Sequence, residues 1–247
     1  MTMKKILIFV VLSGCTLFGF AQVQDTTTIH RKNVIKFLPM NLPFQSISFE
    51  FERMINSRNS VTIGIGLPNQ KSLIGKYGIE ASSDLETLEL GTMHIRAAFR
   101  HYTGKRMLPK GFYIEPYMKY QNIKIGVSYT DTDNQNQSYV NTVDAKLHTM
   151  NMGFQIGTQF LIAKRIAVDF YILGLEAGLL SGEVDGRSTL ITGANELKTK
   201  FDDAIADMPS FIGKKITVTQ SGNQVTAKAS SIPYPWMRGG ISIGIAF

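Results

Sequence analysis

Cysteine and long hydrophobic segments are nearly absent from this chain of 247 residues. Cys15 is the only cysteine, so the chain cannot form an internal disulfide, and without Cys15 it cannot form a thiolate metal site. After the N-terminus the best apolar candidate, residues 166–175, carries Asp169 and is shorter than the roughly 20 residues of a membrane-spanning helix. The sequence therefore excludes a helical membrane protein, and its length suits a single domain.

Motifs for catalysis and for metal or cofactor binding are also lacking. The four histidines show neither H-x-x-x-H nor H-E-x-x-H spacing. His94 and His101 are seven residues apart, so in a strand they point to opposite faces, and neither has a serine two residues on. Because a hydrolase needs a nucleophile beside a histidine, we predict no catalytic residues, no metal ligands and no cofactor.

Positive charge is present but dispersed. The formal net charge is +7, and it is +5 without Lys4 and Lys5. No dense cluster of lysine and arginine is interleaved with aromatic residues, so we predict no nucleic-acid partner. For an exported protein, this balance favours contact with acidic lipopolysaccharide or simple solubility.

The N-terminus has the pattern of a secretory signal. Lys4 and Lys5 form a basic start, residues 6–12 form an apolar core, and Ala21 occupies a small position before a cut at Gln22. This pattern predicts that the protein is exported.

Two interpretations of the N-terminus remain open. In the first, residues 1–21 are a signal peptide and residues 22–247 are a single β-barrel domain. In the second, residues 12–15 (Leu-Ser-Gly-Cys) are a lipoprotein signal, and Cys15 is lipidated rather than removed.

The last eleven residues give the clearest strand signal. Ile241, Ile243, Ile245 and Phe247 fall on one face, and glycine, serine and alanine fall on the other. A period of two over this length indicates a β-strand. A bulky apolar face opposite a small face suits a strand with lipid on one side and the narrow inside of a closed barrel on the other.

The same alternation recurs upstream. We expect strands over 33–38, 46–54, 60–67, 88–102, 111–129, 146–162, 166–180 and 236–247. Pro116 within one of them predicts a local bulge. A soluble barrel or sandwich would carry a richly charged second face, whereas the second face of 146–162 and 236–247 is mainly small or uncharged. We therefore predict an all-β fold, an eight-stranded antiparallel transmembrane β-barrel with long extracellular loops and a short helix in the last loop.

The inward faces of these strands also carry charges of both signs. Eight strands leave an interior just wide enough for side chains, and an unpaired charge there would cost several kcal/mol. We therefore predict a lattice of ion pairs that fills the lumen; a selective polar path is the alternative. The candidates are Lys36, Glu50, Glu52, Arg96, Arg100, Glu115, Lys119 and Asp169.

The connections alternate between long and short, as in outer-membrane barrels. The long ones are 68–87, 130–145 and 181–235, and the short ones are 56–59, 103–110 and 163–165. Within 181–235 we expect Asn195 to cap a helix that ends at Pro209, followed by a hairpin over 214–229. Because 181–235 is too long for a simple connector, we predict that it carries the function. We expect its amphipathic stretch to pack on the barrel rim or on lipid headgroups; the alternative is that it presents an apolar face to a surface partner.

Trp236 and Phe247 bracket the final strand. At roughly 3.3 Å per residue and a tilt of about 40°, they would be separated by about 28 Å along the membrane normal. That separation is close to the apolar band of about 25 Å in such barrels. Each residue is therefore a candidate for an aromatic girdle.

Taken together, these features resemble the eight-stranded outer-membrane barrels of the OmpA/OmpX type and uncharacterised relatives of them in other Gram-negative bacteria. The terminal assembly signal of that family ends in an aromatic residue after alternating apolar positions, a pattern matched by Phe247, Ile245, Ile243 and Ile241. Ile245 stands where the family often has an aromatic residue. The resemblance implies the cell outer membrane as location, and membrane lipid, lipopolysaccharide and the barrel-assembly machinery as partners.

Three functions are compatible with this sequence. We favour a non-enzymatic outer-membrane barrel with a filled lumen, which acts in envelope structure and surface contact through its outer loops. The second is a narrow channel or transporter for small or apolar solutes. The third is an enzyme that modifies lipid A or phospholipid, for which His94 would be required.

Overall fold

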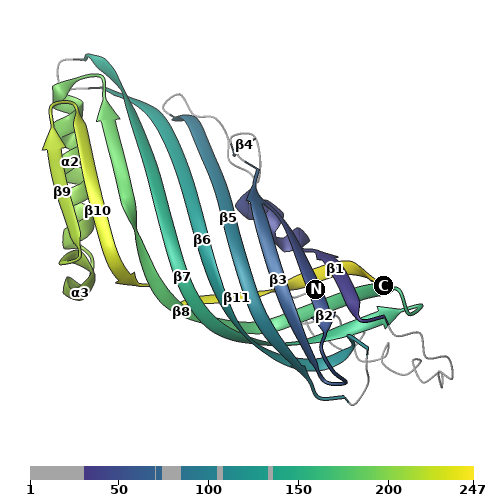
Figure 1. Ribbon diagram of the computed structural model, residues 1–247. Helices are drawn as coiled ribbons and strands as arrows, with labels where there is room; N and C mark the ends of the chain where they lie inside the picture. Colours follow the sequence, from purple (N-terminus) through teal and green to yellow (C-terminus); the bar gives the residue numbers. More distant parts are fainter. Residues whose placement is uncertain (1–30, 70, 74–84, 105–107, 133–135) are drawn as a thin grey trace, which may run out of the picture. The chain divides into compact units, whose positions relative to one another are not determined.

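The computed structural model describes residues 31–69, 71–73, 85–104, 108–132 and 136–247. The expected signal peptide lies outside these residues. Residues 31–247 form one compact unit, which is mostly antiparallel β-sheet (Figure 1). None of the helices in the described part of the chain is long and apolar enough to cross a membrane.

The elements follow one another as a series of strands with one helical insertion near the end. The strands are β1 (Asn33–Phe37), β2 (Ser46–Met54), β3 (Asn59–Pro68), β4 (Lys71–Ser72), β5 (Leu85–Tyr102), β6 (Gly111–Thr132), β7 (Ser138–Ile162), β8 (Ile166–Ser188), β9 (Ile216–Ser221), β10 (Gln224–Pro233) and β11 (Trp236–Ala246). The helical segments are η2 (Pro39–Phe44), α2 (Ile191–Ala206) and α3 (Ser210–Gly213).

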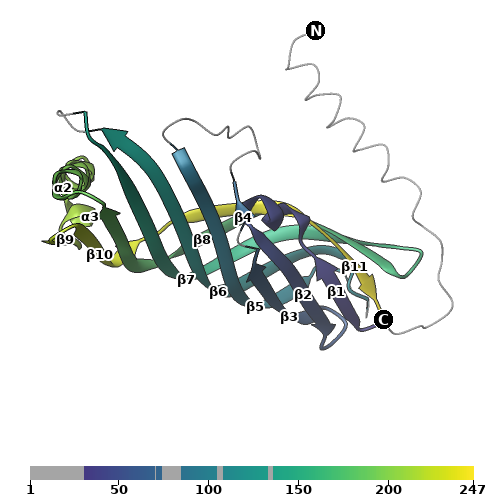
Figure 2. The ribbon, with the colours of Figure 1, turned by 90° about the horizontal axis from the view of Figure 1, so that it is seen from above.

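Eight of these strands close into a ring. In the order β1-β2-β3-β5-β6-β7-β8-β11, each strand pairs with its neighbours in the antiparallel sense, and β11 pairs with β1 to complete the circle. Figure 2 shows the same strands turned by 90° from the view of Figure 1. The prediction of an all-β fold is confirmed, and the ring contains the predicted number of strands.

The strands of the ring are tilted. A row of directly opposite residues starts at Ile162 in β7, passes once around the ring through every strand, and returns to β7 at Met152, ten residues away. For eight strands, a stagger of ten residues corresponds to a tilt of about 40° at the usual strand spacings. The register therefore fixes the width of the ring as well as its closure.

Four strands continue past one end of the ring. There β8 changes partner: residues 166–176 pair with β11, whereas residues 179–187 pair with β10, which in turn pairs with β9 (Figure 1). We call this open part the sheet extension. It consists of residues 85–91, 124–132, 138–147 and 179–188 together with β9 and β10.

Helix α2 packs on the face of the sheet extension that continues the inner face of the ring. Ala194 and Leu197 of α2 are buried against Val225 of β10. Gly186, which lies directly opposite Val225, faces the helix: a Cβ atom there would lie 3.4 Å from the Phe201 ring, in van der Waals contact. The apolar face of the amphipathic helix α2 is thus buried against the sheet extension.

The prediction of a loop over 130–145 was wrong, whereas the helix and the hairpin expected within 181–235 are present as α2 and as β9 with β10. β6 and β7 stay paired as far as Thr132↔Ser138, and the hairpin extends the sheet by pairing with β8. The polar composition of 130–145 suggested a loop, but one face of these strands is buried under α2: Tyr139 is buried, and Val143 packs beneath the helix.

Two local predictions also need correction. Helix α2 begins at Ile191, and Asn195 is inside it, where its Oδ1 accepts a hydrogen bond from Gln220 Nε2 of β9 at 2.7 Å. Pro116 makes no bulge, since the register continues across it from Ala98↔Tyr117 to His101↔Ile114. The ladder lacks only the residue pairs between Ala98↔Tyr117 and His101↔Ile114, because proline has no N–H to donate.

Candidate functional site: the charged interior of the strand ring

The ring has an apolar outer surface and a polar interior. In β2, Phe49 on the outer face is 44% exposed, whereas Glu52 on the inner face is 0% exposed. In β11, Ile245 is 64% exposed and Ser242 only 2%. This arrangement is the reverse of a water-soluble fold, which buries its apolar side chains.

All eight candidate residues face this interior. Seven of them form one connected group, which we call the central cluster, and Lys119 belongs to a second group. The central cluster consists of Lys36, Glu50, Glu52, Arg96, Arg100, Glu115 and Asp169, all buried.

Lys36 of β1 joins carboxylates from two sides of the ring. Its Nζ lies 2.9 Å from Glu50 Oε1, 2.9 Å from Glu52 Oε2 and 3.0 Å from Asp169 Oδ2. It also donates a hydrogen bond to Gln159 Oε1 at 2.9 Å. A single ammonium group therefore links β2, β7 and β8 across the interior.

Arg100 of β5 is the second centre of the cluster. Its Nη1 lies 3.0 Å from Asp169 Oδ2 and 3.2 Å from Glu52 Oε2, and its Nε pairs with Glu115. The guanidinium carbon lies 3.8 Å from the centre of the Tyr113 ring. The planar group is thus held by ion pairs in its plane and by an aromatic face above it.

Arg96 reaches across a strand that carries no side chain at this level. It pairs with Glu50 of β2 and with Glu115 of β6. Gly64 of β3 lies directly opposite both Glu50 and Arg96, and a Cβ atom there would lie 3.8 Å from Arg96 Nε. The small residue leaves the path between the two charges open.

Neutral side chains complete the hydrogen bonding of the acids. Tyr102 Oη and Ser60 Oγ donate to Glu52 Oε1 at 2.6 and 2.7 Å. Tyr113 Oη donates to Asp169 Oδ1 at 2.7 Å. Because buried charges are tolerated only when they are paired and hydrogen-bonded, these bonds keep the acids ionised inside the ring.

A second, smaller group lies nearer the sheet extension. Lys119 Nζ lies 2.6 Å from Glu176 Oε2, and Asn151 Nδ2 and Tyr117 Oη donate to the same carboxylate at 2.9 and 3.1 Å. The Arg238 guanidinium lies 4.8 Å from the centre of the Tyr171 ring. Within the described part of the ring, the two groups together hold five cationic and five acidic side chains, so the interior is formally neutral.

Sequence reasoning missed Glu176 and Arg238. The register of β8 shifts between Ile156↔Leu173 and Gly157↔Tyr171. Before the shift, odd-numbered residues such as Asp169 face inward; beyond it, even-numbered residues such as Glu176 do. Arg238 shares the parity of the small residues in β11. Extending that parity back by one step would have found Arg238, whereas the bulge that decides Glu176 has no signal in the sequence.

The two histidines of β5 lie on opposite faces of the strand. His94 faces the interior, whereas His101 faces outward with Nδ1 2.6 Å from Asn59 Oδ1, so the two do not meet. The described residues contain no group of three or more histidine, cysteine, aspartate or glutamate side chains arranged to hold a metal ion. The chemistry of the interior is mutual neutralisation of charge.

The two aromatic candidates lie at opposite ends of β11. Trp236 is 47% exposed and stacks on Tyr234 with ring centres 5.8 Å apart. Phe247 follows the last residue of the strand and is 54% exposed. Both side chains are thus exposed, but only Phe247 has the outward parity of Ile245; Trp236 lies directly opposite the inward-facing Glu176 and shares the parity of Arg238.

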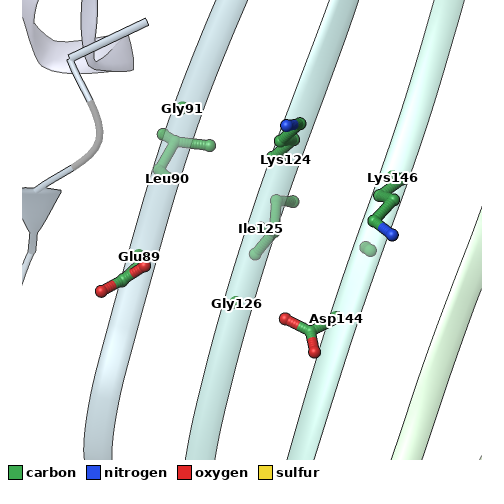
Figure 3. A pocket seen from close by; sticks show the side chains of 9 residues that line it. Glu89, Leu90, Gly91, Lys124, Ile125, Gly126, Asp144 and Lys146 are labelled. Atoms are coloured by element: carbon green, nitrogen blue, oxygen red, sulfur yellow. The ribbon is translucent and has the colours of Figure 1, made fainter.

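A shallow pocket of about 110 Å³ lies on the outer face of the sheet extension (Figure 3). Gly126 forms part of its lining, and the charged side chains around it come from neighbouring strands. Lys124 lies directly opposite Lys146, and Asp144 directly opposite Asp185. Lys146 in turn lies directly opposite Glu183, so charges of both signs line this outer face, which is polar where the outer face of the ring is apolar.

Comparison with known proteins gives no relative: no family model, no curated protein and no solved structure matches this chain.

Proposed function

We propose that this protein is an outer-membrane β-barrel whose lumen is closed by ion pairs and whose sheet extension makes contacts at the cell surface. The observation that carries the proposal is the polarity of the ring, with apolar side chains exposed outside and charged ones buried inside. Exposed apolar area of this extent has a large free-energy cost in water but is favourable in hydrocarbon. Closure of the ring leaves no unpaired edge, which the bilayer interior requires.

The dimensions of the apolar belt support insertion. On β7 the outward side chains from Met150 to Ile162 are apolar apart from Thr158. Twelve residues at about 3.3 Å each, tilted by about 40°, span about 30 Å. This height is close to the roughly 25 Å apolar band of outer-membrane barrels.

The filled interior favours a structural role over transport. The central cluster crosses the ring from β1 to β5 and from β2 to β8 through direct contacts of about 3 Å. Moving an ion or solute through this level would require separating buried ion pairs, each of which costs about 3–5 kcal/mol to break.

Two measurements on the purified protein test this proposal. We expect the folded protein, extracted in detergent, to migrate differently on a gel with and without boiling. After insertion into a planar bilayer, we expect no steady current. Recovery as a water-soluble monomer without detergent would contradict membrane insertion, and a steady current from the heat-modifiable protein would favour the channel.

Enzymatic modification of lipid is tested separately. Because the interior pairs its charges with one another and the two histidines of β5 face opposite ways, we expect the lipid A mass spectrum of a deletion strain to equal that of the parent. A changed profile that His94→Ala reproduces would contradict a purely structural role.

A further inference from the structure

The end of the ring that carries the short turns is rich in basic side chains. We call it the short-turn end; it comprises the start of β1, the last two residues of β2, the turns after β2, β5 and β7, and the end of β11. Its described residues include seven lysine and arginine side chains and no aspartate or glutamate. The seven are Arg31, Lys32, Arg53, Arg58, Lys110, Lys164 and Arg165.

Main-chain hydrogen bonds hold these residues together at one end. Met54 N donates to Lys32 O at 2.8 Å, which ties the first strand to the turn after β2. Ala246 N donates to Arg165 O at 2.7 Å, which ties the last strand to the turn after β7. The side chains of Arg53 and Arg165 are exposed, so the positive charge is presented to the surroundings.

Among the described residues, no aspartate or glutamate belongs to this end. In the described part of the chain, every aspartate and glutamate lies inside the ring, in the sheet extension or in the helical segment 189–215. The acids inside the ring are already neutralised by buried cations. Charges farther away than about 8–10 Å are screened by salt, so the acids of the sheet extension cannot balance the opposite end.

The apolar belt continues directly to this end. Ile162 and Ile166 flank the turn that holds Lys164 and Arg165, and they are 54% and 45% exposed. Side chains at this boundary would lie at the level of lipid headgroups if the belt is in hydrocarbon. A cationic surface at this level is complementary to phosphate groups.

We infer that the short-turn end binds the headgroups of anionic phospholipids in the leaflet that it meets. This inference rests on the proposed membrane function. The ligand is the phosphate of an anionic diacyl lipid, because only a molecule with its tails in the belt and its charge at the headgroup level contacts both features. The outer face of the sheet extension has charges of both signs and should show less selectivity for anionic lipid.

The test uses the full mature chain in vesicles of equal parts phosphatidylcholine and phosphatidylglycerol. Native mass spectrometry after gentle detergent extraction gives the ratio of the two lipids that the protein retains. We expect the wild type to retain about fivefold more phosphatidylglycerol, and we expect 0.5 M salt to reduce this preference, as for any surface electrostatic attraction.

Two matched variants locate the binding surface. One replaces Arg53, Arg58, Lys110 and Arg165 with glutamine; the other replaces Lys124, Lys146, Arg187 and Lys214, which lie at or beyond the sheet extension, with glutamine. We expect the first variant to bring the lipid ratio close to one and the second to keep it. If the first variant loses its heat-modifiable form, the pair Arg53→Gln and Arg165→Gln serves instead and should halve the preference.

The outcomes separate this inference from the proposed function. A protein that fails to enter vesicles of either lipid would overturn both. A protein that enters but retains the two lipids equally, or whose preference falls as much in the sheet-extension variant, would overturn the inference alone.

Discussion

Arg100 illustrates how a side chain that would be costly to bury becomes part of the structure. It contacts four carboxylates and an aromatic face and is almost fully shielded from solvent. Removing one member of such a network leaves the others without a partner, which costs more than the network itself contributes. The interior residues are therefore interdependent, and single substitutions should be more damaging than paired ones.

The Lys119–Glu176 pair allows this to be measured. We expect Lys119→Met and Glu176→Gln each to lower the free energy of unfolding by about 3–5 kcal/mol, because each leaves a buried charge or its hydrogen-bond partners unsatisfied. The double variant should lose less than the sum of the two. Urea unfolding in detergent micelles, monitored by heat-modifiable migration on a gel, gives the free energy of unfolding of the two single variants and of the double variant.

The exposed pair Lys198–Asp202 on α2 is the matched control. Its side chains are 40% and 47% exposed, so removing it should cost no more than about 0.5 kcal/mol. Equal losses for the buried and the exposed pair, or full additivity in the buried pair, would show that the interior charges act independently.

At the scale of elements, the sheet extension depends on α2. Leu197 is 2% exposed and packs with Ala194 and Val225 in the cluster between helix and sheet. Without the helix, the inner face of the sheet extension would expose its apolar side chains to water. The helix thus stabilises strands that extend beyond the support of the closed ring.

Leu197→Ala should loosen this part of the protein. The cavity should lower stability by about 2–5 kcal/mol. The loss should be confined to the sheet extension, because α2 contacts the sheet extension rather than the ring. Native-state hydrogen exchange should speed up in α2, β9 and β10 and stay unchanged in β2 and β3. Asp203→Ala, at an exposed position of the same helix, should leave exchange as it is in the wild type; faster exchange throughout the ring in Leu197→Ala would argue against two separable parts.

At the scale of the molecule, the ring and the sheet extension share strands, but the ring closes without the sheet extension. The partner change in β8 separates them, because its first half completes the ring with β11 and its second half pairs with β10. Ring closure therefore does not require β9, β10 or the helices.

Replacing residues 181–231 by Asn-Gly should leave the ring able to assemble. Leu180 and Ile232 are directly opposite in the native pairing, and a two-residue Asn-Gly turn is the favoured connection for such a pair. We expect heat-modifiable migration to persist while contact with any surface partner is lost. A shortened protein that cannot close would mean that the sheet extension is part of the folding unit of the ring.

The sequence by itself determined the alternation of the ring strands, and with it the all-β class, the number of ring strands and the inward direction of Lys36, Arg96 and Arg100. The sequence could do so because each face of a ring strand has a single environment, apolar outside and polar inside. The period of two in side-chain polarity is therefore visible without knowing which strands pair. The apolar outer face and the short turns follow from the same pattern.

Tertiary structure alone decided which inward charges meet, and where the strands end. Lys36 and Asp169 are 133 positions apart in the chain and meet because the ring closes with a stagger of ten residues. Glu176 faces inward because of a bulge, and residues 130–132 and 138–145 are strand because α2 covers one face of this part of the sheet. Polar segments become strands here through contacts with distant parts of the chain, and such contacts leave no periodic mark on the local sequence.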